Sequence, residues 1–389
     1  MTTRYPLVVV GGGIHGVGVA QAAAARGYRT LLLEREALAA ATSRSSSKLI
    51  HGGLRYLESA QFGLVRESLR ERELLLRLAP GLVRRVAFHI PVYRHSRRGP
   101  STIRAGLSLY ALLGNLGRNA RFQRLTRGDW PGLDGLSPEG LRAVFRYHDA
   151  QTDDAALTRA VMRSAESLGA ELACPAEFLG AERHAGGWRL RYRDRAGDRE
   201  CDAAALVNAA GPWVNAVART IAPPPPCPPI ELVQGAHIVL DRRLARGAYY
   251  LEAPQDRRAV FVLPWRDRTL VGTTETPRGD TPVPAAALPE EIAYLEEVVR
   301  RYFPEWRERT EGSFAGLRVL PHGSGRIFHR PRDTVLVAEP GHGPRLVSIY
   351  GGKLTGYRAT AQKVMRMLAA TLPARRGSAD TAELPLTPE

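Results

Sequence analysis

The first forty residues show the hydrophobic pattern of a buried β-α-β unit. Leu7–Val10 and Thr30–Leu33 are short, continuous apolar runs, and the segment between them is rich first in glycine and then in alanine. Continuous apolar runs of this length are typical of parallel strands that are covered on both faces. The alanine-rich segment predicts a helix through about Ala25, which Gly27 ends.

The pattern changes after Ile230, where apolar and polar residues alternate. Alternation predicts strands with one buried face, as in an antiparallel sheet. The clearest alternating runs are His237–Leu240, Val260–Pro264 and Leu270–Thr273. Short apolar strands return near the end and run into a glycine-rich turn and a closing helix. The sequence therefore predicts an α/β fold, in which a discontinuous, Rossmann-like nucleotide-binding domain carries an inserted antiparallel-sheet domain.

The proline-rich run Pro223–Pro229 marks one boundary between these domains. The predicted nucleotide-binding domain comprises residues 1–65, 146–222 and 331–389. The predicted second domain, which would face the substrate and the membrane, comprises residues 66–145 and 223–330.

Three segments outside the first unit carry further predictions. Gln61–Leu78 has the periodicity of a long helix, and Val83–Tyr93 predicts a pair of strands broken at Pro91. Ser101–Gly117 is apolar and weakly amphipathic, so it predicts either a core helix or an interfacial helix. In the second case, the preceding arginine pair, Arg97 and Arg98, would bind anionic lipid headgroups.

A pair of carboxylates, Asp153 and Asp154, opens the predicted helix Asp153–Leu168. Paired carboxylates suggest acid–base chemistry or a metal site, but carboxylates in a first turn also favour the helix dipole. We interpret this pair as capping residues.

Composition narrows the class of protein. A length of 389 residues predicts two or three domains. Three widely spaced cysteines exclude a disulfide framework and a thiolate metal cluster, and we predict no metal site. The chain enters its first strand directly and has no apolar run near the ~18 residues that span a bilayer. We therefore expect a cytoplasmic protein without a signal peptide.

The net charge of +16 consists almost entirely of scattered arginines, and no nucleic-acid-binding motif accompanies them. We expect no nucleic-acid partner, and attribute the charge to attraction for anionic lipid or an anionic substrate. Because arginine has replaced lysine nearly everywhere, the few lysines become informative. Lys48 and Lys353 lie in serine- or glycine-rich motifs, whereas Lys363 lies on a plausible helix.

The glycines after the first strand form a dinucleotide-binding fingerprint. Gly11, Gly13 and Gly16, with Gly12 between them, permit a tight turn that brings a pyrophosphate close to a helix N-terminus. Glu34 follows the second strand and is placed to accept the ribose 2′-hydroxyl, which argues against NADP.

Two more segments would border this nucleotide. Ala41–Glu58, ATSRSSSKLIHGGLRYLE, has too many hydroxyl residues and glycines for an ordinary helix and no strand alternation, so we interpret it as an active-site wall. A later apolar strand enters a turn at Gly211 and would close over the same nucleotide.

Several motifs together resemble FAD-dependent glycerol-3-phosphate dehydrogenases, within the D-amino-acid-oxidase-like flavoproteins. They are GGGIHG with Glu34, SKLIHGGLRYLE, LVNAAGPWV, QGAHIV, FVLPW, VGTTE, GLRVL and YGGKLTGYR, in the family's order. The resemblance runs from about Tyr5 to Arg358. It implies FAD, hydride transfer from C2 of sn-glycerol 3-phosphate to flavin N5, dihydroxyacetone phosphate as product and quinone as electron acceptor. It also implies a peripheral position on the inner face of the cytoplasmic membrane; a homo-oligomer is left open.

The resemblance also implies roles for individual residues. The ADP half of FAD would lie on the opening glycines and Glu34. The pyrophosphate and flavin would lie against Thr42, Ser43, Lys48 and Leu49, and the ribityl chain and pyrimidine end against Gly351, Gly352, Leu354 and Thr355. The substrate pocket would consist of Arg55, Tyr56, His237, Arg318 and Lys353, joined by Arg332 or, as second choice, Arg330.

The chemistry asks for the same kinds of residue. A phosphate dianion needs guanidinium forks, and alcohol oxidation needs a base for the hydroxyl proton, which a neutral histidine supplies. We expect His237 to be this base and His51 to be the alternative. Positive charge from Lys353 would stabilise the reduced flavin.

Three departures separate this sequence from the resembled pattern. Glu275 replaces a usual aspartate, Gly356 replaces a frequent threonine, and the sequence ends at Glu389 where the typical enzyme continues into a helical C-terminal domain. Two alternatives therefore stay open. The first is a related FAD oxidoreductase or oxidase for another small phosphorylated or carboxylated hydroxy or amino compound. The second is an inactive FAD-binding paralogue.

Overall fold

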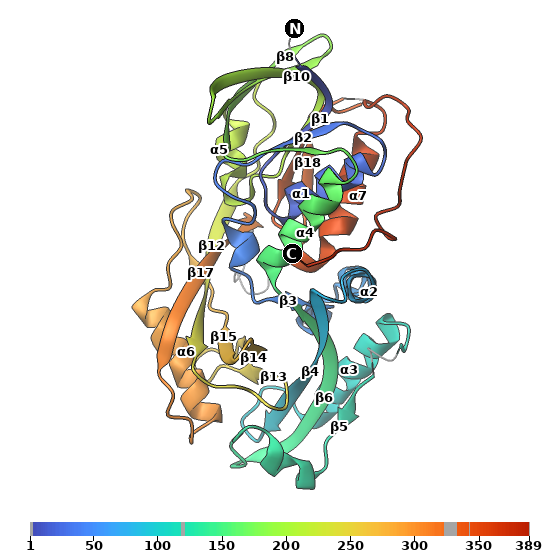
Figure 1. The fold of residues 1–389 in the computed structure, drawn as a ribbon. Helices are drawn as coiled ribbons and strands as arrows, with labels where there is room; N and C mark the ends of the chain where they lie inside the picture. Colours follow the sequence, from blue (N-terminus) through green and yellow to red (C-terminus); the bar gives the residue numbers. More distant parts are fainter. Residues whose placement is uncertain (1–2, 118–120, 323–332, 342, 389) are drawn as a thin grey trace.

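The computed structural model describes residues 3–117, 121–322, 333–341 and 343–388. These residues form two β-sheets, one above the other in Figure 1, with helices packed against both. The chain alternates between them: strands within residues 3–33, 171–222 and 335–350 belong to the upper sheet, and strands within residues 49–152 and 230–321 belong to the lower sheet.

The upper sheet has the strand order β11-β8-β9-β10-β1-β2-β7, with β19 also paired to β10 and β18 to β19. Strands β10, β1, β2 and β7 run parallel, as does β19 beside β10, whereas β8, β9 and β10 form antiparallel hairpins. The described strands are β1 (Thr3–Val10), β2 (Thr30–Leu33), β7 (Glu171–Ala173), β8 (Ala176–His184), β9 (Gly187–Asp194), β10 (Gly197–Asn208), β11 (Ile221–Ala222), β18 (Val335–Ala338) and β19 (Leu346–Tyr350).

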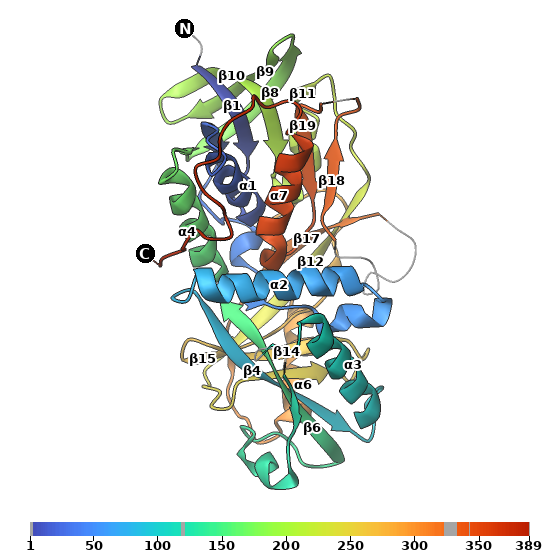
Figure 2. The same cartoon turned by 90° about the vertical axis from the view of Figure 1, so that its right-hand side faces the viewer.

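One layer of helices covers this sheet. Figure 2 shows α1 (Ile14–Ala24) between α4 (Asp154–Glu166) and α7 (Tyr357–Met367), so the start, middle and end of the chain meet in one layer. The buried side of α1 is made of valine and alanine, whose small side chains let the neighbouring helices approach closely. The predicted β-α-β unit and the discontinuous Rossmann-like arrangement are confirmed.

The lower sheet has the order β16-β12-β15-β14-β13-β4-β6-β3, with β17 beside β12 and β5 beside β6. Its pairs are antiparallel except for β13 with β4. The strands are β3 (Leu49–Ile50), β4 (Val83–Tyr93), β5 (Gln123–Arg124), β6 (Leu141–Thr152), β12 (Ile230–Leu240), β13 (Ala248–Glu252), β14 (Ala259–Trp265), β15 (Arg268–Gly272), β16 (Thr276–Pro277) and β17 (Thr310–Pro321).

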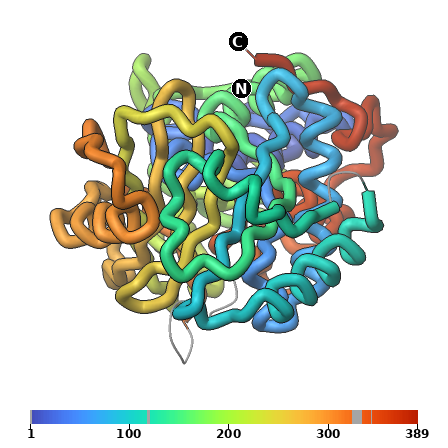
Figure 3. The backbone as a smooth tube through the Cα atoms, turned by 90° about the horizontal axis from the view of Figure 1, so that it is seen from below, coloured from blue at the N-terminus to red at the C-terminus, as the bar shows by residue number. Residues whose placement is uncertain are grey.

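Helices lie on both sides of the lower sheet. Seen from below in Figure 3, α6 (Pro289–Tyr302) lies on one side, and α2 (Phe62–Leu78) and α3 (Pro100–Leu113) lie on the other. Figure 2 shows α2 lying across the junction between the upper and lower parts. The short helices are η1 (Thr42–Arg44), η2 (Leu54–Ser59), η4 (Arg127–Gly132), η5 (Gly211–Trp213), α5 (Val214–Ala218) and η7 (Leu354–Gly356).

One strand prediction was wrong. Val83–Tyr93 is a single strand, β4, and is not broken at Pro91. Along β4, the partner β13 pairs only with Phe88 and His89, so Pro91 lies beyond that ladder and its missing N–H interrupts no pairing there. On the other side, Pro91 is matched with Val144 of β6. Proline is compatible with a strand at such a position.

The predicted division into domains follows the two sheets approximately and stays a prediction. The prediction and the structure differ at β3 and β6, which pair with each other in the lower sheet. Residues 49–50 and 146–152 had been predicted in the nucleotide-binding domain. The Ala41–Glu58 segment therefore passes from one sheet to the other.

A buried polar cluster fixes α2 and α3 to this crossing point. The guanidinium of Arg72 on α2 lies 2.6 Å from Asp149 on β6, and both side chains are almost fully buried. The hydroxyl of Tyr110 on α3 donates to Asp149 at 2.9 Å and accepts the backbone N–H of Gly52, also at 2.9 Å. The cluster thus joins two helices, a strand and the active-site wall.

We predict that Asp149→Ala lowers the free energy of unfolding by about 3–5 kcal/mol, because it removes the buried carboxylate partner of Arg72 and leaves only the half-exposed Glu73. Urea unfolding followed by circular dichroism measures the change. Asp198→Ala is the matched control, since Asp198 pairs with Arg193 on an exposed hairpin and should leave the transition midpoint nearly unchanged. Equal effects of the two substitutions would contradict a central role for the Arg72–Asp149 pair.

Candidate functional site

A continuous cavity of ≈1550 Å³ lies between the two sheets. Its walls come from the glycine turn after β1, the segment 40–49, η5, β17 and the turn before α7. Five separate stretches of chain thus meet around one space, which matches the discontinuous arrangement of the sheet. A long, partly apolar cavity with convergent polar groups is the usual form of a cofactor site.

The glycine turn carries the first wall of the cavity. A Cβ on Gly16 would lie 1.9 Å from the Gly11 carbonyl oxygen, so only glycine permits this turn. The Glu34 carboxylate accepts the backbone N–H groups of Gly12 at 2.6 Å and Glu36 at 2.8 Å. These bonds fix the carboxylate at the edge of the turn, where the fingerprint predicts the ribose hydroxyl.

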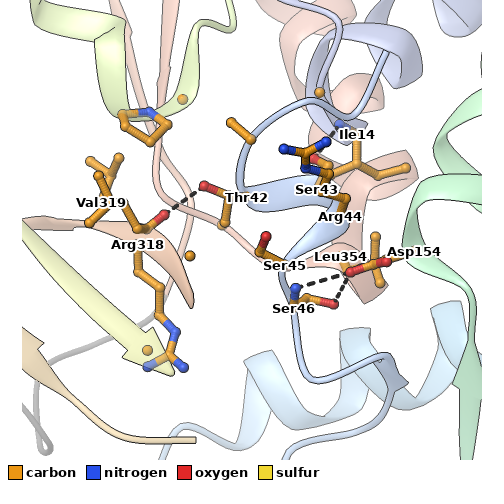
Figure 4. A pocket seen from close by; sticks show the side chains of 18 of the residues that line it. Ile14, Thr42, Ser43, Arg44, Ser45, Ser46, Asp154, Arg318, Val319 and Leu354 are labelled. Carbon is orange, nitrogen blue, oxygen red and sulfur yellow. Dashed lines mark hydrogen bonds between the residues drawn. The ribbon is translucent and has the colours of Figure 1, made fainter. Parts of the chain in front are cut away.

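Three hydroxyl side chains hold the next wall, which Figure 4 shows as one loop. Ser43 accepts the backbone N–H of Ile14 at the start of α1, at 2.9 Å. Thr42 donates to the carbonyl oxygen of Leu317 on β17 at 2.6 Å. Ser46 donates its hydroxyl to Asp154 at 2.7 Å and its backbone N–H at 3.0 Å. The loop is therefore tied to β17 of the lower sheet and to the first residues of α1 and α4, which pack against the upper sheet.

Lys48 completes this wall through a buried ion pair. Its ammonium lies 2.7 Å from the Asp154 carboxylate, with the two side chains 7% and 0% exposed. It also lies 5.4 Å from the ring centroid of Trp265 and 5.1 Å from that of Phe314. Lys48 lines the cavity, but its charge is already matched inside the protein.

Both aspartates accept a backbone N–H at the start of α4. Asp153 is the N-cap and accepts the N–H of Ala156 at 3.0 Å, and Asp154 accepts that of Ala155 at 2.9 Å. The Asp154 carboxylate also binds Lys48 and Ser46 of the Ala41–Glu58 segment, which the sequence did not predict. Of the lysines, Lys363 pairs with Glu67 on the surface at 2.7 Å.

The cationic residues of the predicted substrate pocket line the same cavity. Arg55 lies on η2, Arg318 on β17 and Lys353 just before η7. The Lys353 ammonium lies 3.8 Å from the ring centroid of Tyr56. The Arg318 guanidinium donates to Thr273 at 2.9 Å and passes over Gly235, where a Cβ would lie 2.5 Å from its Nη2. The absence of a side chain at Gly235 thus makes room for this arginine.

The two candidate bases differ in their surroundings. His51 lines the cavity, and its backbone N–H donates to Thr355 at 3.1 Å. Burial, followed by the charges of Lys353 and Arg55, lowers the pKa of His51 to about 3. The imidazole is therefore neutral at pH 7.

His237 is 1% exposed and is not among the described residues that line the cavity. Its ring stacks on Phe314 at a centroid distance of 4.9 Å, and its Nε2 lies 2.9 Å from the Ser47 hydroxyl. Burial, then the charges of Arg318 and Lys48, depress the pKa of His237 well below its usual value. Among the described residues, this histidine packs behind the cavity wall, and its role as the base stays a prediction.

Most of the predicted site residues thus meet in one cavity. Besides His237, Gly16 lies behind the wall, because it packs on the glycine turn itself. Arg332 and Arg330 lie outside the described residues. The cavity-lining residues that were predicted are Gly11, Gly12, Gly13, Glu34, Thr42, Ser43, Lys48, Leu49, His51, Arg55, Tyr56, Gly211, Arg318, Gly351, Gly352, Lys353, Leu354 and Thr355.

Sequence reasoning missed three partners of these residues. Asp154 was taken for a cap, Ser47 was not distinguished from the neighbouring serines, and Glu275 was seen only as a departure from a motif. A pairing between distant residues leaves no local pattern, so the scarcity of lysine and the resemblance to a family drew attention to Lys48 without indicating its partner. Nothing in the sequence pointed from Lys48 to Asp154.

The residues present fit FAD. The cavity contains a glycine turn at a helix N-terminus with a carboxylate beside it, as an adenosine pyrophosphate requires. It continues without interruption to the turn at Gly351 and Gly352 and to the cations beyond. We assign the predicted cofactor residues to this role as a proposal.

Comparison with known proteins gives the same result. The model of the family described as FAD dependent oxidoreductase, DAO, matches residues 6–358. The glycerol-3-phosphate dehydrogenase of Pseudomonas aeruginosa is 39% identical over 388 residues, which cover 98% of this chain and 75% of the relative. The D-erythritol 1-phosphate dehydrogenase of Brucella abortus is 36% identical over 387 residues, which cover 95% of this chain and 75% of the relative.

A solved structure extends the likeness to three dimensions. The glycerol-3-phosphate dehydrogenase from Bacillus halodurans, complexed with FAD, superposes with a TM-score of 0.72 at 27% identity. The match covers 98% of this chain and 68% of that one. The chain belongs to the DAO family of FAD-dependent oxidoreductases, and its cofactor is FAD.

Proposed function

We propose that this protein oxidises sn-glycerol 3-phosphate to dihydroxyacetone phosphate and passes the electrons to a quinone. The observation that carries the proposal is the convergence of Arg55, Arg318 and Lys353, from three separate elements, in the cavity that also contains the glycine turn. A site for a small phosphate monoester requires such a set of cations. The likeness to glycerol-3-phosphate dehydrogenases supports the choice of substrate.

Each residue has a separate task in this reaction. Arg55 and Arg318 bind the phosphate through their guanidinium forks, which fixes the position of C2. His51, neutral at its lowered pKa, accepts the proton of the C2 hydroxyl as the carbonyl forms. Lys353 holds the same oxygen by a charge-assisted hydrogen bond. When bound, FAD supplies the acceptor for the hydride that leaves C2.

A longer polyol phosphate is the second candidate substrate. The Brucella abortus relative is a D-erythritol 1-phosphate dehydrogenase, and its identity to this chain is close to that of the glycerol-3-phosphate relative. Both compounds carry a phosphate monoester and a neighbouring secondary alcohol, so the same cations and base would serve either.

We predict that anaerobic addition of glycerol 3-phosphate bleaches the oxidised flavin band of the FAD-loaded protein. Glycerol at the same concentration is the matched control and should leave the band unchanged, because it has no phosphate for the arginines. Retained colour with glycerol 3-phosphate, but bleaching with D-erythritol 1-phosphate, would select the second substrate. Retained colour with both would favour an inactive paralogue. Faster turnover with oxygen than with a soluble quinone would indicate an oxidase.

We predict that His51→Asn lowers kcat by about 10²- to 10⁴-fold, the usual contribution of a general base. His237→Asn should lower kcat far less, since that ring faces Ser47 and Phe314 behind the cavity wall. Stopped-flow measurement of flavin reduction separates the two, with flavin content as the check on folding. A larger loss in the His237 variant would return the role of base to His237.

The proposal includes attachment to an anionic membrane surface. Within the described parts of the chain, no helix has the length and apolar character needed to cross a bilayer. Helix α3 buries Leu107, Tyr110 and Ala111, yet Leu112 on the same helix is 60% exposed and Leu116 just beyond it is 61% exposed. Exposed leucines can insert among the acyl chains at a membrane surface. The positive charge of the protein would attract the anionic headgroups above them.

We predict that the protein sediments with vesicles of phosphatidylglycerol more than with vesicles of phosphatidylcholine. Replacing Leu112 and Leu116 together by glutamate should reduce this binding, because both apolar contact and attraction to the anionic surface are lost. A double substitution of Ala185 and Ala196 by glutamate is the matched control, because it adds the same charge at exposed turns of the upper sheet, away from α3, and should reduce binding less. Equal sedimentation with both lipids would exclude an electrostatic contribution.

A further inference from the structure

A carboxylate lies in the middle of the arginines that line the substrate end of the cavity. Glu275, just after β15, has its Oε1 3.3 Å from Nη1 of Arg318 and 3.9 Å from Nη1 of Arg55. Its Oε2 lies 3.5 Å from Nη1 of Arg258. One oxygen therefore faces both cavity-lining arginines, while the other faces an arginine behind them.

The exposed fractions show which groups face the cavity. The side chain of Glu275 is 6% exposed, whereas those of Arg55 and Arg318 are 22% and 26% exposed. Glu275 also lines the cavity, but a smaller fraction of its side chain is exposed than of the two arginines that it contacts. Both arginines line the cavity, from η2 and from β17.

Glu275 is itself anchored from behind. Arg258 contacts the Asp256 carboxylate at 2.7 Å, and Asp256 accepts the hydroxyl of Tyr294 on α6 at 2.9 Å. Arg258 is not among the described residues that line the cavity. A chain of contacts therefore connects α6 to Glu275, and Glu275 to the arginines of the pocket.

Electrostatics gives this arrangement a role. Guanidiniums from η2 and β17 repel each other when they lie close together, and a carboxylate that contacts both reduces this repulsion. A site whose cations are already in place loses less free energy on binding than one that must assemble around its ligand.

We propose that Glu275 is a positioning residue, which holds Arg55 and Arg318 side by side and so presents a preformed site for the phosphate of a phosphate monoester. Glu275 acts through the two arginines and does not itself touch the phosphate. The inference deepens the proposed function and rests on it for the identity of the substrate. The binding of inorganic phosphate tests it without any turnover.

The test compares Glu275→Gln with the parent, both loaded with FAD. Titration calorimetry with inorganic phosphate should show a Kd raised about ten- to hundred-fold, the usual range for losing one charged hydrogen-bonding partner. For glycerol 3-phosphate, KM should rise by a similar factor with kcat little changed. A merely structural defect would instead lower flavin content, the thermal midpoint and kcat together.

Two further variants complete the design. Glu311→Gln is the matched control, because Glu311 pairs with the exposed Arg268, and its Kd for phosphate should equal that of the parent. Glu275→Asp keeps the charge but withdraws it by one methylene, so its Kd should lie between the parent and Glu275→Gln. If Glu275→Gln does not fold, Glu275→Asp alone should still bind phosphate more weakly than the parent.

An unchanged or tighter affinity for phosphate in either Glu275 variant would overturn the proposal, since the carboxylate would then be neutral toward the anion or would compete with it. The outcome is separable from that of the proposed function. If glycerol 3-phosphate fails to bleach the flavin but Glu275→Gln still weakens phosphate binding, the positioning role stands and only the substrate is wrong.

Discussion

The buried ion pair between Lys48 and Asp154 is the interaction on which the site depends. It joins the loop after β2 to the start of α4, and Ser46 reaches the same carboxylate. Burying two charges has a high desolvation cost, and their attraction offsets it only with close geometry and further hydrogen bonds. Both are present here. The same residues therefore fix the course of the loop whose other side chains face the cavity.

Much of the fold follows from local pattern. The β-α-β unit could be predicted because its strands, its glycines and Glu34 lie close together in sequence and each has a physical reason for its position. Alternation correctly distinguished the second sheet. The break predicted at Pro91 was wrong. Proline interrupts a strand only where a neighbouring strand needs its N–H. How far the neighbouring strand β13 extends along β4 is decided by the folded sheet and is not visible in the sequence around Pro91.

The site was less accessible to sequence reasoning alone. The arginines of the pocket were expected only through the likeness to a family, since single arginines in a chain with so many carry no signal of their own. Which histidine meets the cavity depends on the direction of the side chain. On β12, the His237 side chain contacts Ser47 and Phe314. His51 lies beside Thr355, to which its backbone N–H donates. The residues that flank each histidine in the sequence do not predict the direction of its side chain.

The hydroxyl of Tyr110 has a mechanical consequence. It connects the backbone of the cavity wall at Gly52 to helix α3, whose other side presents Leu112 to the exterior. Arg72 binds Asp149, and Asp149 accepts the same hydroxyl. The exposed side of this helix is therefore linked by one hydroxyl and one backbone N–H to the residue next to His51, so a displacement of α3 would be transmitted to the wall of the cavity.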